Sequence, residues 1–327
     1  MERRNFLRGT TGLAIAGSLA MPAVAASGGF PSRPVTMIVP FPPGGATDVA
    51  ARTMAEKMAP LLGQPVIVDN KPGAQTAIGA DAAARAEPDG HTMLMASGTT
   101  MTLNPLLPDK LPYKAEDFAP VALVTTLPFG IVVRKGLAHD IESFVALAKA
   151  RGGQLNYGSN GPTSFNNLAA VVVMEGLGIK MQEITYRGDA QQLTDLMSGT
   201  LDVISVGGSS SLAALRAGRG TVIGWTGEKG ERLAVTPDIP NFAELGPDMV
   251  CQTHFGLLVP ARTPPAAIAR LNAAAQQAMQ APDLRKRLLD EGQYVVGGTA
   301  EAYATYLQRD RDRWRDLVTR LAKSNPA

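Results

Sequence analysis

One stretch of the sequence decides the fold class: VTMIVPFPPGGATDVAARTMAEKM, which runs from Val35 to Met58. It predicts a β-branched strand, a Pro/Gly loop and an amphipathic helix that opens at Thr47 and Asp48. The first N–H groups of a helix have no partner within the helix and carry partial positive charge, so such a junction suits an anion. A second stretch repeats the arrangement: LNYGSNGPTSFNNLAAVVVM, from Leu155 to Met174. Two loops of this kind, facing each other, can hold a small carboxylate without a catalytic side chain.

Strand-like and helical patterns alternate along the rest of the chain. Apolar residues recur on one helical face in segments that stop at Gly63, Gly152 and Gly199, and the stretch beyond Pro264 is also helical. Strands are predicted at Val35–Val39, Val66–Val68, Thr92–Met95, Val121–Val124, Ile131–Val133, Leu155–Tyr157, Glu183–Tyr186, Val203–Val206, Val222–Trp225 and Gly256–Val259. This alternation indicates an α/β protein with mostly parallel sheets and helices on both faces. The chain is long enough for two domains.

The first 25 residues have the features of an export signal. A basic start with Arg3 and Arg4 precedes a short apolar stretch, and Ala23-Val24-Ala25 predicts cleavage after Ala25. The 13 residues between Arg8 and Pro22 are too few to span a bilayer, which takes about 20. The run RRNFLR also resembles a twin-arginine signal, and the alternative is an ordinary Sec signal with adjacent arginines. We therefore expect a mature protein in the periplasm.

The charge of the mature chain is balanced. Residues 1–25 hold three of the 31 basic residues and one of the 29 acidic residues, which leaves 28 of each. This balance gives no reason to expect nucleic-acid or membrane-surface binding. Cys251 is the only cysteine, so no intramolecular disulfide is possible, and we expect its thiol to act as a small buried hydrophobic group.

Catalytic and metal-binding motifs are missing from the sequence. It has no Gly-x-Ser-x-Gly elbow, no Gly-x-Gly-x-x-Gly and no Walker loop. The three histidines are far apart and lack metal-ligand spacing: we expect His91 and His139 at the surface and His254 in a structural role near Cys251. We expect no catalytic residue, no metal and no cofactor. A secreted α/β enzyme acting on a small organic acid remains the alternative.

Seven ordered motifs closely resemble the periplasmic solute receptors of tripartite tricarboxylate transporters, the Bug family. They are PFPPGGATDVAAR (Pro40–Arg52), LGQPVIVDNKPGA (Leu62–Ala74), EPDGHTMLMAS (Glu87–Ser97), LPYKAEDFAPVALV (Leu111–Val124), LNYGSNGPTS (Leu155–Ser164), TYRGDAQQLTDLMSG (Thr185–Gly199) and RLAVTPDIPNFAELG (Arg232–Gly246). The resemblance implies a type II periplasmic binding protein, in which two lobes joined by two crossing strands close over a ligand. It places residues 26–127 and 252–327 in lobe 1 and residues 128–251 in lobe 2.

The resemblance also implies the ligand contacts, made mainly by backbone N–H groups and ordered waters. The first loop supplies Phe41, Gly44, Gly45, Ala46, Thr47 and Asp48, the facing loop supplies Ser159, Asn160, Gly161, Thr163 and Ser164, and Ser97 and Thr99 follow a strand end. Asp48 suits a helix N-cap better than a ligand contact. Ser164 suits a cap and an anion donor equally.

The sequence departs from the family pattern in the second lobe. Pro162 stiffens the loop, Thr163 stands where the family commonly has glycine, and Asn167 stands where it commonly has His. Arg187 either pairs with a ligand carboxylate or forms an ion pair within the protein. Asp189 either caps its helix or points into the cleft, where it would repel a second carboxylate and favour an amine or hydroxyl.

The resemblance implies a receptor for a small organic acid, a mono- or dicarboxylate that includes aromatic acids. The receptor would deliver this ligand to the membrane permease subunits of its transporter. We expect a monomer.

Overall fold

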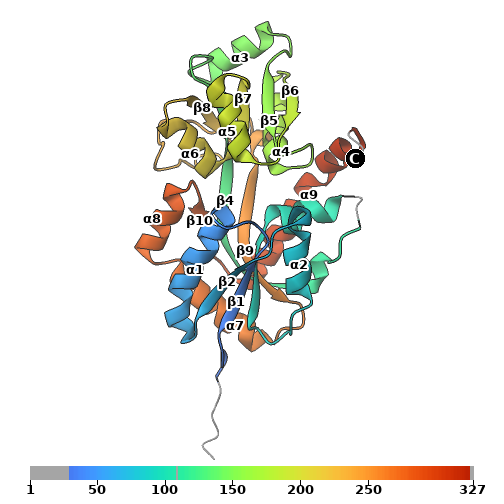
Figure 1. The fold of residues 1–327 in the computed structure, drawn as a ribbon, viewed down its shortest axis with the longest axis vertical. Coiled ribbons are helices and arrows are strands. Elements are labelled where there is room, and N and C mark those ends of the chain that lie inside the picture. Colours follow the sequence, from blue (N-terminus) through green and yellow to red (C-terminus); the bar gives the residue numbers. More distant parts are fainter. Residues whose placement is uncertain (1–28, 108–109, 325–327) are drawn as a thin grey trace, which may run out of the picture.

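The computed structural model describes residues 29–107 and 110–324. Its helices and strands form two lobes stacked along the long axis of the molecule (Figure 1). We call them the lower lobe and the upper lobe, after their places in Figure 1. The predicted export signal, residues 1–25, lies outside the described residues. Within the described part of the chain, no helix is both long enough and apolar enough to cross a membrane.

The elements follow the predicted alternation. In the described residues the strands are β1 (Val35–Val39), β2 (Val66–Asn70), β3 (Thr92–Ser97), β4 (Phe118–Arg134), β5 (Asn156–Ser159), β6 (Gln182–Thr185), β7 (Val203–Gly207), β8 (Gly220–Trp225), β9 (Gln252–Pro260) and β10 (Tyr294–Val295). The α-helices there are α1 (Ala46–Leu62), α2 (Ala77–Ala84), α3 (Ile141–Ala150), α4 (Phe165–Leu177), α5 (Asp189–Ser198), α6 (Gly208–Arg216), α7 (Pro265–Ala278), α8 (Pro282–Asp290) and α9 (Ala300–Ser324). Each predicted strand is present, and the two predicted at Val121–Val124 and Ile131–Val133 are parts of the single long strand β4.

Helix α1 shows how the sequence builds these elements. Met54 and Met58 on its apolar face are completely buried in the core of the lower lobe. The helix ends as predicted at Gly63, which takes a left-handed conformation (φ 72°) and donates its N–H to the Ala59 carbonyl oxygen at 3.0 Å. The helix begins at its other end, just after the loop that follows the carboxyl end of β1.

The sheets are more mixed than the predicted parallel arrangement. In the lower lobe β1 pairs in parallel with β2 and β3, and in the upper lobe β5 pairs in parallel with β6 and β7. Strand β4 crosses between the lobes: residues up to Pro128 pair with β9, and residues from Phe129 pair with β7 and β8. The pairings of β4 with β7, β8 and β9 are all antiparallel, so β4 and β9 run in opposite directions through the junction.

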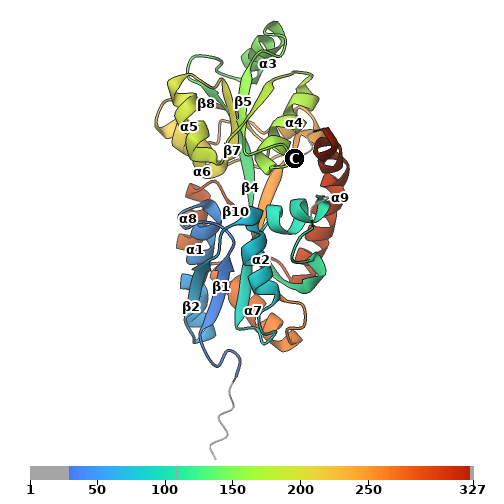
Figure 2. The same ribbon diagram turned by 45° about the vertical axis from the view of Figure 1, so that its right-hand side comes forward.

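The C-terminal helix α9 connects the lobes a second time. It begins in the lower lobe and runs along one side of the molecule up to α4 (Figure 2). Trp314 on this helix is buried, and its ring meets Phe165 of the upper lobe edge-on, with centroids 6.0 Å apart. Arg313 Nη2 donates to the Val250 carbonyl oxygen at 2.6 Å. This side of the interlobe junction is therefore packed, with a continuous apolar cluster that includes Cys251.

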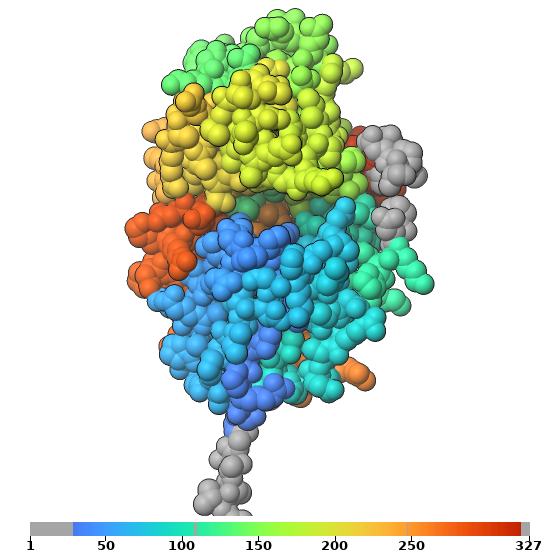
Figure 3. All heavy atoms as spheres, viewed as in Figure 1, coloured from blue at the N-terminus to red at the C-terminus, as the bar shows by residue number. Residues whose placement is uncertain are grey.

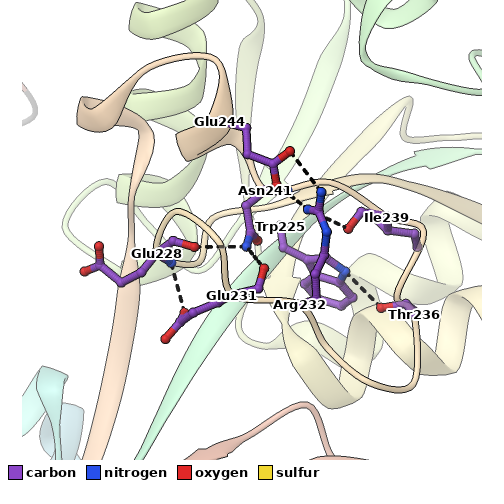
Figure 4. Close-up of polar contacts among 8 residues, drawn as sticks. All are labelled: Trp225, Glu228, Glu231, Arg232, Thr236, Ile239, Asn241 and Glu244. Carbon is purple, nitrogen blue, oxygen red and sulfur yellow. Dashed lines mark hydrogen bonds and ion pairs between the residues drawn. The ribbon is translucent and has the colours of Figure 1, made fainter.

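The loop between β8 and β9 returns the chain to the junction and is held by its own side chains (Figure 4). Asn241 Nδ2 donates to the backbone carbonyl oxygens of Glu228, at 3.1 Å, and Glu231. The Glu231 carboxylate accepts a 2.8 Å hydrogen bond from Gln252, the first residue of β9. These bonds fix where the second crossing strand begins.

Candidate functional site

The loop between β1 and α1 presents bare backbone to the space between the lobes. Gly44 has a φ of 89°, which favours glycine, and Gly45 is the N-cap of α1 without any side-chain cap. Both glycines are exposed, and a Cβ on either would meet no atom within 4 Å. The unpaired N–H groups of the first turn of α1 are therefore open to an anion.

Asp48 does not cap the helix as expected; its side chain binds the loop that precedes the helix. It is the third residue of α1, because Gly45 takes the N-cap position, and its side chain is buried. Its carboxylate accepts the Gly44 N–H, Arg52 Nε and Asn70 Nδ2, each at 2.9 Å. Burial raises the pKa of Asp48, but the hydrogen bonds from these three partners outweigh it and leave the pKa below its ordinary value.

The facing loop, between β5 and α4, is held by hydrogen bonds within the loop and to the neighbouring strand β6. Buried Ser159 donates its hydroxyl to Glu183 and accepts the Gly161 N–H at 3.0 Å. Gly161 needs its φ of 104°, and its carbonyl oxygen accepts the Ser164 hydroxyl at 2.7 Å. Thr163 is half-buried. The loop geometry is thus set before any ligand arrives.

Ser164 is the N-cap of α4. Its Oγ accepts the Asn167 N–H at 3.2 Å, and its single hydroxyl proton goes to the Gly161 carbonyl oxygen. Of the two readings of this residue, the structure favours the cap. Asn167, at the position where the family commonly has His, is buried and donates to the Pro162 carbonyl oxygen at 2.7 Å. It therefore ties down the stiffer loop of this chain.

Asp189 does not cap its helix either. The N-cap of α5 is Gly188, and the Asp189 side chain makes no capping bond. Its carboxylate accepts hydrogen bonds from Asn160 Nδ2 (3.0 Å), Asn166 Nδ2 (3.2 Å) and Ser210 Oγ (2.9 Å). These donors belong to the loop after β5 and to the first turns of α4 and α6. Asp189 therefore lies where three helices of the upper lobe begin.

Ser97 and Thr99 lie at the end of β3 beside a left-handed turn. Ser97 is buried and its Oγ lies 3.2 Å from Thr100 Oγ1, while Thr99 is half-buried. Thr100 Oγ1 donates to Thr76 Oγ1 at 3.0 Å. Thr76 ends a run of three non-glycine residues with positive φ, from Ala74 to Thr76, a backbone state that costs about 1–2 kcal/mol per residue. This hydroxyl chain holds the turn at the edge of the interlobe space.

Contacts between the lobes flank a hollow. On one flank a Cβ on Gly98 would lie 2.7 Å from the Phe165 ring at the start of α4, and on the other a Cβ on Gly208 would lie 2.9 Å from the Gly292 Cα. Figure 3 shows a recess between the lobes, with the blue start of α1 below and the yellow α5–α6 region above. The carboxyl ends of β1 and β5 border this recess, the usual place for ligands in α/β sheets.

The structure groups the expected site residues into two clusters. The β1–α1 loop forms one cluster, and Ser159, Asn160, Gly161, Ser164 and Asp189 form the other through direct hydrogen bonds. Among the described residues, no hydrogen bond joins the two clusters across the recess. Arg187 is exposed and forms no ion pair within the described residues, contrary to one of its two expected roles.

Sequence reasoning missed the residues that hold the two carboxylates. Arg52 stands four residues after Asp48, a spacing that brings the side chains together on a helix. Asn70 reaches Asp48 because β2 lies beside β1 in register. Ser210 belongs to a third strand–glycine–helix junction, VGGSSSLAAL (Val206–Leu215), which has the same form as the other two.

The histidine predictions need one correction. His139 is exposed as expected, but His91 is 6% exposed because the Phe30 ring packs edge-on against it at 5.0 Å. His254 and Cys251 are buried, and burial raises the pKa of the Cys251 thiol. Among the described residues, no His/Cys/Asp/Glu group is arranged to hold a metal ion.

Comparison with known proteins identifies the family. Residues 50–322 match the model of the tripartite tricarboxylate transporter family receptor, so the chain belongs to this family. Similar solved structures include MatC from Rhodopseudomonas palustris with bound malate, which is 32% identical over 88% of this chain and 100% of its own, with a TM-score of 0.75. The periplasmic binding protein BugD is 27% identical over 90% and 99% of the two chains (TM-score 0.75). A second R. palustris protein, with adipate, is 26% identical over 90% and 98% (TM-score 0.79).

These matches confirm the two-lobed α/β fold and the class of function. The chain is a solute-binding receptor, and its family comprises periplasmic binding proteins. The comparisons give no support to the alternative of a secreted α/β enzyme.

Proposed function

We propose that this receptor captures a small carboxylate between its lobes and delivers it to the permease subunits of a tripartite tricarboxylate-type transporter. The observation that carries the proposal is the start of α1 at the edge of the interlobe recess, where the exposed Gly44 and Gly45 leave the backbone uncovered. The malate and adipate bound by two similar proteins support the same chemistry. Mono- and dicarboxylates, aromatic acids included, are the proposed ligand class.

The proposed mechanism is docking on one lobe followed by closure. A carboxylate first accepts N–H groups from the start of α1, near Gly44, Gly45, Ala46 and Thr47, with Phe41 beside them. Each charge-assisted bond contributes about 1.5–3 kcal/mol, so three or four support micromolar binding, which takes about 8 kcal/mol after association costs. Closure follows because only the closed form lets the ligand reach the second-lobe loop as well.

The remaining parts of the proposal concern organisation. We assign residues 26–127 and 252–327 to lobe 1 and residues 128–251 to lobe 2. The change of β4 partners after Pro128 supports this division. Thr163 and Thr99, both half-buried, are the proposed side-chain contacts. Asp48, Ser97, Ser159 and Ser164 act by shaping the loops, and the receptor works as a monomer.

We propose that residues 1–25 direct export by the twin-arginine route and are removed by cleavage after Ala25. N-terminal sequencing of the exported protein is expected to begin near Ala26. Replacing Arg3 and Arg4 together with lysine is expected to block export, because that route recognises the arginine pair. Normal export of the double variant would assign the Sec route instead.

A thermal-shift screen of small mono- and dicarboxylates tests the proposed ligand class. At least one acid is expected to raise the melting temperature, because a ligand at 100 times its Kd stabilises the native state by about 2.7 kcal/mol. The methyl ester of that acid, which lacks the charge, is the matched control and is expected to have no effect. X-ray scattering is expected to show compaction with the acid. Stabilisation by sugars or cations only would contradict the proposal.

A further inference from the structure

We propose that Asp189 selects the ligand: the group placed against the upper lobe is a hydrogen-bond donor, above all a protonated amine. The receptor then takes amine-bearing carboxylic acids in preference to plain dicarboxylates. This inference rests on the proposed function and names the substrate class of the same site. It assigns the carboxylate end of the ligand to the start of α1 and the amine end to Asp189.

The position of Asp189 relative to the recess follows from its neighbours. Its three hydrogen-bond donors lie at the carboxyl end of β5 and in the first turns of α4 and α6. The starts of these same two helices touch the lower lobe, at Phe165 against Gly98 and at Gly208 against Gly292. Asp189 lies between these two contacts and is half-buried, not covered. It therefore belongs to the part of the upper lobe that faces the recess.

The Asp189 carboxylate keeps an unused acceptor position. A carboxylate offers about four lone-pair sites, and the described structure fills three of them with neutral donors. Asn160 and Asn166 share one oxygen, while Ser210 takes the other. The oxygen bound only to Ser210 therefore has room for a further donor.

The charge of Asp189 also lacks a partner. No ion pair involves it within the described residues, whereas the other carboxylate of the site, Asp48, pairs with Arg52 at 2.9 Å. A half-buried, unpaired carboxylate gains most from a cation, which adds Coulomb attraction to a charge-assisted hydrogen bond.

The two lobes thus offer opposite chemistry to a ligand. The start of α1 presents N–H donors for an anion, and the upper lobe presents an acceptor that carries negative charge. A second carboxylate placed there would be repelled by the negative charge of Asp189. It would also lack hydrogen-bond donors, because Asn160, Asn166 and Ser210 already donate to Asp189. A hydroxyl would fill the open acceptor position but would leave the charge unpaired.

The sharpest variant is Asp189→Asn, because the surrounding bonds can survive it. The amide oxygen can still accept from Asn160 and Asn166, and the amide nitrogen can donate to the Ser210 hydroxyl, which is also an acceptor. Asp195→Asn is the matched control: Asp195 lies on the same helix and accepts the Tyr186 hydroxyl at 2.8 Å, outside the Asp189 cluster. Both variants remove one negative charge from α5.

Calorimetry with acids that differ only by an amine tests the inference. The pairs are succinate with aspartate, butyrate with 4-aminobutyrate, and 4-methylbenzoate with 4-(aminomethyl)benzoate. In at least one pair the amine-bearing acid is expected to bind the unaltered protein at least tenfold more tightly. In Asp189→Asn this preference is expected to fall at least tenfold, with Asp195→Asn unchanged.

Each outcome separates this inference from the proposed function. Equal binding of both members of every pair, or a preference that Asp189→Asn leaves intact, would overturn the role of Asp189 while the carboxylate receptor stands. Equal binding of both members of every pair by the unaltered protein would overturn the inference even if Asp189→Asn failed to fold, and in that case Asp189→Ser, which also removes the charge and keeps a hydroxyl, replaces it in the test. If no carboxylate binds, the proposed function fails and the inference fails with it.

Discussion

Replacing Trp314 with alanine is expected to lower the free energy of unfolding by about 3–5 kcal/mol. The ring is 2% exposed and packs between the lobes against Phe165, so its removal leaves a cavity at the junction. The indole Nε1 also donates to Asp310 Oδ1 at 3.1 Å, and this buried carboxylate would lose a donor. Chemical denaturation measures the loss.

Trp314→Phe separates the two contributions. It keeps one aromatic ring against Phe165 but removes the N–H and part of the buried ring volume, so we expect a loss of about 2–3 kcal/mol, smaller than that of Trp314→Ala. Because α9 connects the lobes, Trp314→Ala is also expected to split the calorimetric transition into two. A single transition with a loss below about 1 kcal/mol would contradict the role of α9 as a connector.

Replacing Asp48 with alanine is expected to abolish ligand binding and to lower the free energy of unfolding by about 2–3 kcal/mol. The change leaves the Gly44 N–H and Asn70 Nδ2 without their acceptor and releases the loop at the start of α1. Calorimetry and denaturation measure the two effects. Ser164→Ala is the comparison: it removes one helix cap, and we expect about 1 kcal/mol of lost stability with a smaller effect on binding. If Ser164→Ala weakened binding more than Asp48→Ala, the β5–α4 loop, and not the β1–α1 loop, would be the main contact of the ligand.

The fall in the free energy of unfolding at acid pH is a second test of the role of Asp48. Its pKa is lower in the folded protein than its ordinary value, so its contribution is present above the ordinary value of 3.8 and is lost as the pH falls through the lowered pKa. In Asp48→Asn this part of the acid-induced loss is expected to disappear. Denaturation curves between about pH 6 and pH 2 compare the two proteins.

Local sequence signals predicted the elements well because each carries its own physical cause. Gly63 and Gly199 end α1 and α5 with positive φ, as expected from glycine after an apolar helical face. The loops of the two candidate clusters were found for the same reason. The two predicted strands that merge into β4 show the limit. The residues between them, which include Pro128, were not predicted as strand, yet they are extended because the chain crosses between the lobes there and its pairing partners change.

Side-chain partners could not be predicted, because they depend on tertiary neighbours. Asp48 and Asp189 both looked like helix caps, but glycines at 45 and 188 occupy the cap positions and free both carboxylates for other donors. Which donors these are depends on sheet register and on where other helices begin. His91 was expected at the surface because its turn is polar, and Phe30, 61 residues earlier in the chain, covers it.

The packing of α9 limits how a solute can come and go. α9 closes one flank of the recess, the contact of Gly208 with Gly292 closes the other, and β4 and β9 run through the junction. The face shown in Figure 3 opens onto the recess between these two flanks. We therefore expect the solute to enter and leave through this face, and we expect the rim formed by the start of α1 and by α5 to lie closest to the membrane protein that receives the solute.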